Sequence, residues 1–129
     1  MNATYPRNEK LKSKSTIDLL FSEGKSVSKY PLRLVYAVIN SEEKIKMGVS
    51  VSKKNFKHAV DRNYFKRLLR ETYRHNKHLL APLDRSYACM FFYQSKERMP
   101  YSEINAKTIA LFQKFVLQVN TEAPDDLSQ

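Results

Sequence analysis

The sequence predicts one α+β domain, an α/β sandwich in which a sheet packs against helices. The chain has 129 residues, a common size for one domain with its own core. Strand-like apolar runs are interspersed with segments whose apolar residues recur every three or four positions, as in helices. Because the two kinds of segment alternate along the chain, we expect them to share one core. We expect residues from about 10 to 119 to be ordered, with flexible tails at 1–9 and 121–129.

The first expected element is a helix at residues 14–23. Ile17, Leu20 and Phe21 lie three and four positions apart, which places them on one helical face. Gly24 follows as a stop signal, so the helix is expected to end there.

Two longer helices are expected later in the chain. One runs from about residue 58 to 80 and stops before Pro82, because proline cannot continue a helix. The last runs from about 102 to 119, with Ser102 as a suitable N-cap and an apolar stripe along one side.

Three strands are expected between these helices. Residues 31–39 are rich in branched apolar side chains, and residues 45–52 alternate between apolar and polar. Residues 86–94 are apolar almost throughout, which is typical of a central strand covered on both faces. The polar turn at 40–44 is short enough for the first two strands to pair as an antiparallel hairpin. The predicted order is α-β-β-α-β-α, with room for one further strand before the long helix.

The composition restricts the partners of the protein. With 23 Lys/Arg and 13 Asp/Glu the net charge is +10, which attracts polyanions such as nucleic acids and anionic membranes. No apolar run approaches the ~20 residues of a membrane-spanning helix, and the N-terminus lacks the apolar core of a signal peptide. The single cysteine, Cys89, lies in an apolar run, so a buried thiol in a reducing cytoplasm is expected. We therefore expect a cytoplasmic protein that binds no membrane.

The excess charge is concentrated around the expected long helix. Residues 53–78 hold nine Lys/Arg and only two Asp/Glu, a net charge of +7. A face that is merely solvated normally carries acidic partners, because like charges one helical turn apart repel by about 0.2–0.5 kcal/mol per pair. The concentration favours a surface that holds a polyanion.

Helical geometry separates this helix into two sides. At about 100° per residue, Phe65, Leu68 and Leu69 fall on one side and predict the buried face. The cations of the helix fall on the opposite side or beside it: Arg62, Lys66, Arg67, Arg70, Arg74 and Lys77. The neutral Asn63 lies beside them. Arginine dominates, and its planar guanidinium suits phosphate contacts and stacking on bases.

The same residues offer little catalytic chemistry. Only Gly24 and Gly48 are present, so a glycine-rich phosphate loop and the nucleotide-dependent enzymes that use one are excluded. The carboxylates are scattered, and no pair predicts a two-metal nuclease site. His75 and His78 lie three positions apart without an evident third ligand. The residues therefore indicate an RNA-binding module with no active site, bound metal or small-molecule substrate of its own.

Residues 50–74, SVSKKNFKHAVDRNYFKRLLRETYR, resemble the protein subunit of bacterial ribonuclease P. That family has a strand ending in Ser-Lys-Lys, then Ala-Val, then Arg-Asn-x-x-Lys-Arg-x-x-Arg-Glu on a helix. The matching residues here are Ser52, Lys53, Lys54, Ala59, Val60, Arg62, Asn63, Lys66, Arg67, Arg70 and Glu71. The Phe-x-x-Gly ending of the family's first helix matches Phe21 to Gly24, and the likeness covers most of residues 10–118.

Three positions depart from the family pattern. Tyr64 stands where the family usually has the second arginine of Arg-Asn-Arg, so a phosphate contact or a metal-linked contact is replaced by a ring that can stack. Ile17 stands where an aromatic residue is common. A glycine frequent before the long helix is missing within residues 55–58.

The resemblance implies the fold and the partners. It implies a left-handed βαβ crossover through the long helix, whereas the general rule favours a right-handed connection in about 98% of cases. It implies one catalytic RNA per protein, which carries the Mg²⁺ ions and cleaves the 5′ leader from precursor tRNA. The chain would thus be a subunit of an endonuclease whose catalytic centre lies in the RNA.

The resemblance also assigns residues to the two RNAs. The catalytic RNA would contact the long helix through Arg62, Asn63, Lys66, Arg67, Arg70 and Arg74. The precursor leader would enter a cleft between the sheet and the first helix, with Ile17, Phe21, Tyr36, Ser52, Lys53 and Lys54 as its candidates. From their residue type alone, Tyr36, Tyr93 and Phe21 are either core residues or platforms for unpaired bases.

Two other functions remain compatible with the residues. A general module for structured RNA, for instance ribosome-associated, would need the same focused charge without a role in cleavage. A protein-only nuclease would need clustered carboxylates, which the sequence does not show.

Overall fold

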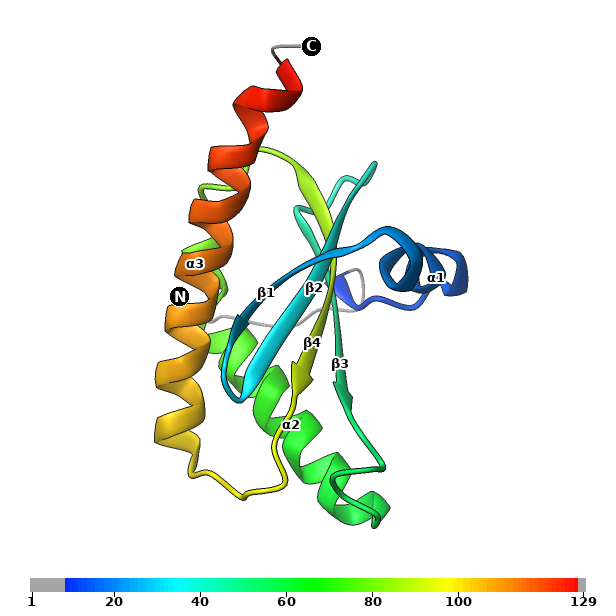
Figure 1. Ribbon diagram of the computed structural model, residues 1–129, viewed down its shortest axis with the longest axis vertical. Helices are drawn as coiled ribbons and strands as arrows, with labels where there is room; N and C mark the ends of the chain where they lie inside the picture. Colours follow the sequence, from blue (N-terminus) through cyan, green and yellow to red (C-terminus); the bar gives the residue numbers. More distant parts are fainter. Residues whose placement is uncertain (1–8, 128–129) are drawn as a thin grey trace.

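The computed structural model describes residues 9–127 as a four-stranded sheet with helices on both faces (Figure 1). In chain order the elements are α1 (Lys14–Glu23), β1 (Lys25–Lys29), β2 (Leu32–Ile39), β3 (Ile45–Val51), α2 (Ala59–Asn76), the short 3-10 helix η2 (Lys77–Leu80), β4 (Ser86–Tyr93) and α3 (Tyr101–Leu127). The predicted α+β sandwich is confirmed. The further strand is β1, which the sequence marks only weakly because Val27 is its single apolar residue.

The strand order in the sheet is β1-β2-β4-β3, and the predicted hairpin between β2 and β3 is wrong. β4 lies between them, antiparallel to β2 and parallel to β3. The reason lies in the burial of β4, of which six of eight residues are buried and the other two half-buried. A strand that is apolar on both faces gains most from a central position, whereas β3 carries half-buried polar residues and tolerates the edge.

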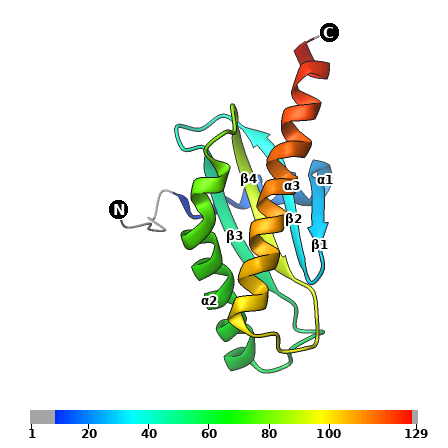
Figure 2. The ribbon, with the colours of Figure 1, turned by 90° about the vertical axis from the view of Figure 1, so that its left-hand side faces the viewer.

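The connection from β3 through α2 to β4 is left-handed. In Figure 2 both strands run downward, α2 lies in front of the sheet, and β4 lies to the right of β3. A right-handed connection would place β4 on the other side. The expectation drawn from the resemblance is therefore confirmed, and the general rule would have given the wrong hand.

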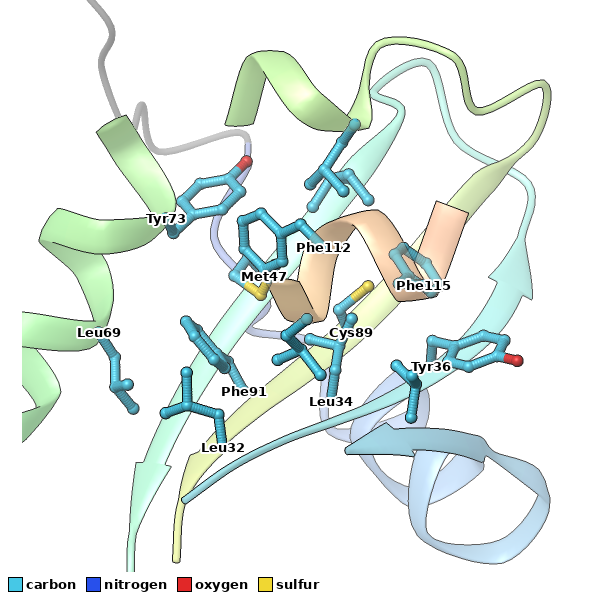
Figure 3. Packing of buried hydrophobic residues seen from close by; sticks show 14 of the residues in the cluster. Leu32, Leu34, Tyr36, Met47, Leu69, Tyr73, Cys89, Phe91, Phe112 and Phe115 are labelled. Carbon is cyan, nitrogen blue, oxygen red and sulfur yellow. The ribbon is translucent and has the colours of Figure 1, made fainter. Parts of the chain in front are cut away.

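The larger core lies between the sheet and the pair α2 and α3 (Figure 3). Its fully buried side chains come from all of these elements: Leu34, Met47, Phe65, Leu69, Tyr73, Cys89, Phe91, Phe112 and Phe115. Phe65 stacks on both Phe56 and Tyr93, with ring centroids 4.7 and 4.6 Å apart. This packing fixes the rotation of α2 and with it the direction of the opposite, solvent-facing side.

A smaller core lies on the other face of the sheet, under α1. Leu20 packs there with Val35, Ala88 and Met90. Gly24 ends α1 against this face, because a Cβ at this position would come within 2.3 Å of the Leu20 carbonyl oxygen and 2.7 Å of a Val35 methyl group. Glycine is thus required by the close approach of the chain to β2.

Glu9 makes contacts within the fold, and the last helix is longer than predicted. Glu9 accepts hydrogen bonds from the Tyr73 hydroxyl at 2.7 Å and the Lys77 amine at 3.2 Å, both on the α2 side of the molecule. The next residues run beside β3, where the Leu11 amide donates to the Met47 carbonyl at 3.0 Å. Helix α3 continues to Leu127 instead of ending near 119. The remainder of the predicted tails, 1–8 and 128–129, lies outside the described residues.

Candidate nucleic-acid interface

Helix α2 divides into a buried and an outward side, as predicted. Phe65 and Leu69 are fully buried, and Leu68 packs against the same core from a half-buried position. Two buried residues of this helix, Tyr73 and Asn76, escaped the sequence analysis because each carries a polar group. Both groups are satisfied by hydrogen bonds: the Tyr73 hydroxyl with Glu9, and the Asn76 amide with the Thr72 carbonyl at 2.8 Å.

The centre of the outward side presents cations that make no hydrogen bond or ion pair within the described residues. Asn63, Arg67 and Arg70 are exposed, and Lys66 is half-buried. Within residues 9–127 neither Lys66 nor Arg70 makes a hydrogen bond or an ion pair. Positively charged groups that lack an internal partner remain available for phosphate oxygens.

Two of the predicted RNA-contacting arginines are engaged within the chain. Arg62 donates two hydrogen bonds, to the carbonyls of Phe56 at 2.9 Å and Lys57 at 2.7 Å, and so holds the loop that leads into α2. Arg74 pairs with Glu71 one turn earlier on the helix. Arg62 therefore has a structural role that its place in the motif did not reveal.

The acidic residues of α2 are also paired. Asp61 accepts from Arg98 at 3.0 Å, and Glu71 is bound by Arg74. Across the described part of the chain no three His, Cys, Asp or Glu residues come together as a metal site would require. These paired carboxylates do not form a ready set of Mg²⁺ ligands, and the placement of Mg²⁺ on an RNA partner stays a prediction.

A groove of about 440 Å³, the β3-edge groove, runs between α2 and the N-terminal arm. Its lining comes from the arm, α1, β3, β4 and α2: Lys10, Leu11, Lys12, Ile17, Met47, Gly48, Val49, Arg70 and Met90. Three of these side chains are cations and most others are apolar. Gly48 lets the Met90 side chain approach β3 closely at the floor of the groove, because a Cβ there would meet that side chain at 3.2 Å.

A second groove, the arm groove, lies on the other side of the N-terminal arm and has a volume of about 320 Å³. It shares Lys10 and Lys12 with the β3-edge groove and adds Lys46 from β3. Lys10 and Lys12 were not among the predicted site residues, although their alternation with Leu11 is the spacing of an extended segment with one cationic side.

The predicted leader-binding residues are only partly brought together. Ile17 lines the β3-edge groove, and Phe21, one turn further along α1, is 65% exposed. Ser52, Lys53 and Lys54 are exposed in the turn after β3, where the Ser52 hydroxyl accepts a hydrogen bond from the Lys54 amide at 3.0 Å.

Tyr36 lies away from any cleft between α1 and the sheet, and its prediction there is wrong. Its side chain points to the opposite face, is 3% exposed, and packs against Phe115 with ring centroids 4.8 Å apart. Its hydroxyl accepts from the Gln118 amide at 2.6 Å. Tyr93 is equally buried, so neither tyrosine is a platform for bases. Adjacent strand residues point to opposite faces, and Val35 occupies the α1 face instead.

The fold and this surface together define a class. A small α+β protein with a left-handed crossover presents a cationic helix beside basic grooves, as an RNA-binding protein does. No helix within residues 9–127 has the length and apolarity needed to cross a membrane. The family model for ribonuclease P matches residues 5–116. The chain therefore belongs to the family of bacterial ribonuclease P proteins, subunits of a ribonucleoprotein endonuclease that processes tRNA precursors.

Individual relatives agree with this assignment. The ribonuclease P protein component of Porphyromonas gingivalis (strain W83) is 42% identical over 100 residues, covering 73% of this chain and 72% of the relative. That of Chlorobium phaeobacteroides is 40% identical over 82 residues, 60% and 56% of the two chains. The ribonuclease P protein structure from Thermotoga maritima superposes with a TM-score of 0.68 at 23% identity, covering 82% of this chain and 96% of that one. At this identity the structural match supports the fold alone.

Proposed function

We propose that the outward side of α2 binds the catalytic RNA of ribonuclease P and that the α1 side of the sheet receives the 5′ leader of precursor tRNA. The observation that carries this proposal is the concentration of cations without internal partners on α2, next to a basic groove with an apolar floor. Each such cation that meets a phosphate releases condensed counterions, which favours binding at low salt.

The catalytic RNA is assigned to α2 because the helix itself is held rigidly against the core. The helix is fixed by the packing of Phe65 and Leu69, and Arg62 holds the preceding loop. Asn63, Lys66, Arg67 and Arg70 then project from one surface, and a duplex or a folded RNA offers phosphates over a comparable area.

The leader is assigned to the α1 side because a single strand needs a narrower site. The β3-edge groove supplies Lys10 and Lys12 for the backbone of the leader and apolar walls for its bases, while Arg70 lies where the groove meets α2. Lys53 and Lys54, exposed at the end of β3, and Phe21 on α1 extend this site beyond the groove. Mg²⁺ would act from the RNA, and the assembled particle would work in the cytoplasm.

Leader removal in the presence and absence of the catalytic RNA tests the proposal. Precursor tRNA is incubated at low Mg²⁺ with the protein, with the RNA encoded in the same genome, and with both. We expect cleavage at the mature 5′ end only when RNA is present, and faster cleavage when the protein is added. Cleavage by the protein alone would contradict the proposal, because it would place the catalytic centre in this chain.

A general structured-RNA-binding module is the alternative that the same charge allows. Such a protein would bind unrelated folded RNAs as tightly as the catalytic RNA and would leave leader removal at low Mg²⁺ unchanged. The two functions are therefore separated by competition with an unrelated structured RNA in the same assay.

A further inference from the structure

Tyr64 presents an aromatic ring on the otherwise cationic outward side of α2. Its side chain is 38% exposed, whereas the neighbouring Phe65 is fully buried. The other large hydrophobic side chain exposed on α2 is Val60, near the start of the helix. An exposed ring among arginines has no evident role in the core. The residues around the ring therefore indicate what kind of ligand it can bind.

The ring of Tyr64 packs against a buried neighbour, which holds it in place. Tyr64 meets Phe65 edge to face, with ring centroids 5.1 Å apart and ring planes at 87°. Phe65 is itself stacked between buried aromatic residues, so the support is rigid. A ring that is already ordered loses little conformational entropy when it binds a partner.

Two guanidinium groups lie over the ring of Tyr64. The Arg98 carbon Cζ lies 5.3 Å and the Arg67 carbon Cζ 5.9 Å from the Tyr64 ring centroid. Arg98 comes from the loop between β4 and α3 and is fixed by its ion pair with Asp61 at 3.0 Å. The cluster of Tyr64, Arg67 and Arg98, here called the Tyr64 platform, thus joins two segments far apart in sequence.

This combination matches the chemistry of an unpaired nucleotide. The part of the ring that the guanidinium groups leave exposed stacks on a base of any sequence, and these groups bind the phosphate of that base or stack beside it. A base-paired helix would present phosphates but no free base face, and a protein partner would need an apolar patch larger than one ring.

We propose that the Tyr64 platform binds an unpaired base of the catalytic RNA by stacking. This inference rests on the proposed function, because it assumes that the outward side of α2 faces that RNA. It goes further by assigning Tyr64 as a base contact and by adding Arg98, which lies outside the helix, to the interface.

Binding by Tyr64 variants tests the stacking contact. Tyr64→Phe keeps the ring and is expected to bind the catalytic RNA like the unchanged protein, whereas Tyr64→Leu is expected to bind about 5- to 100-fold more weakly, as loss of one stacked base predicts. The dependence of affinity on salt should be the same for both variants, because no phosphate contact is removed. Thermal melts check that both variants fold. Equal affinity of Tyr64→Leu and the unchanged protein would overturn the proposal.

A fluorescent variant gives a second, direct measurement. The chain contains no tryptophan, so Tyr64→Trp introduces a single indole at the platform. Its emission should be quenched when the catalytic RNA encoded in the same genome is added. Leu117→Trp serves as the matched control, because Leu117 is 70% exposed on α3 and lies outside the proposed interface.

The outcomes separate this inference from the proposed function. Quenching of Tyr64→Trp, with no change for Leu117→Trp, supports the platform. Quenching only after precursor tRNA is added would overturn the assignment to the catalytic RNA. If the unchanged protein promotes leader removal but the Tyr64→Trp emission stays constant, the platform is wrong and the proposed function stands. If the unchanged protein neither binds the RNA nor promotes cleavage, the proposed function itself fails.

Discussion

Cys89 lies at the centre of the sheet and is fully buried between β2 and β3. Its register partners are Tyr36 on one side and Met47 on the other. Burial raises the pKa of the Cys89 thiol well above its usual value near 8.5. The thiol is thus neutral in the folded protein at neutral pH, and the sequence-based expectation of a buried thiol is confirmed.

The raised pKa has a defined effect on stability. Below about pH 8.5 the thiol is neutral in both the folded and the unfolded chain, and it contributes no pH dependence. Above that pH the unfolded chain loses the proton and the folded chain keeps it. We therefore expect the free energy of unfolding to fall by up to about 1.4 kcal/mol per pH unit from this group alone.

Urea denaturation between about pH 7.5 and 9.5 measures this effect. Cys89→Ala is the control, because it removes the titrating group, and its stability should fall less over the same interval. A thiol reagent should modify Cys89 only after unfolding. Rapid modification of the native protein would show that the centre of the sheet opens more readily than the packing indicates.

At the scale of single residues, the sequence predicted burial correctly where the surrounding residue types determine it. It did not predict which face of a strand a side chain occupies. Cys89 needed only an apolar run around it. Tyr36 needed the strand phase to be known, and its immediate neighbour Val35 took the α1 face instead. Arg62 matched the family motif, but its bonds to the preceding loop depend on how that loop folds.

Helix α2 combines two kinds of arginine on one element. Arg62 is bound to backbone carbonyls of the loop before the helix, whereas Arg70 is exposed and makes no ion pair or hydrogen bond within the described chain. Replacing either by alanine removes one positive charge from the same element. Comparing the two variants therefore separates the effect of an arginine on stability from its effect on RNA binding.

We expect Arg70→Ala to weaken binding of the catalytic RNA without changing the melting temperature of the protein. The slope of log affinity against log salt should fall by roughly 0.7–0.9, the loss of one phosphate contact. Arg62→Ala should instead lower the melting temperature, because the hydrogen bonds that it removes contribute about 0.5–1.5 kcal/mol each. Salt titrations of binding and thermal melts of the free proteins distinguish the two. An unchanged slope for Arg70→Ala would show that this part of α2 does not face the RNA.

The elements themselves were largely predictable because each carries its own periodicity. The ends of α1 and the buried side of α2 follow from apolar spacing and Gly24. The pairing of strands does not, since proximity in sequence favoured a hairpin of β2 and β3 while burial favoured β4 between them. The β3-edge groove was missed in part because its lysines lie in the arm, outside any regular element.

The whole molecule carries a net charge of +10, of which residues 53–78 carry +7. Mutual repulsion of these cations opposes folding, and a bound anion relieves it. We expect sulfate to raise the melting temperature more than chloride does at the same ionic strength, by roughly 3–5 °C per kcal/mol of binding free energy.

A double variant separates specific anion binding from the general effect of sulfate. Sulfate stabilises most proteins through exclusion from their surface, so Lys66→Ala combined with Arg70→Ala should show a smaller response than the unchanged protein. Scanning calorimetry in matched salts provides the comparison. Equal responses would mean that the outward side of α2 binds no anion in the free protein.

The central position of β4 has a consequence for the order in which the protein can be made. β2 and β3 leave the ribosome early, but neither has its main partner until residues 86–93 have been synthesised. During that interval α2 is already complete and its apolar side has no finished sheet to cover it. The nascent chain therefore carries an unprotected apolar helix face and two open strand edges, the features that attract chaperones and promote aggregation.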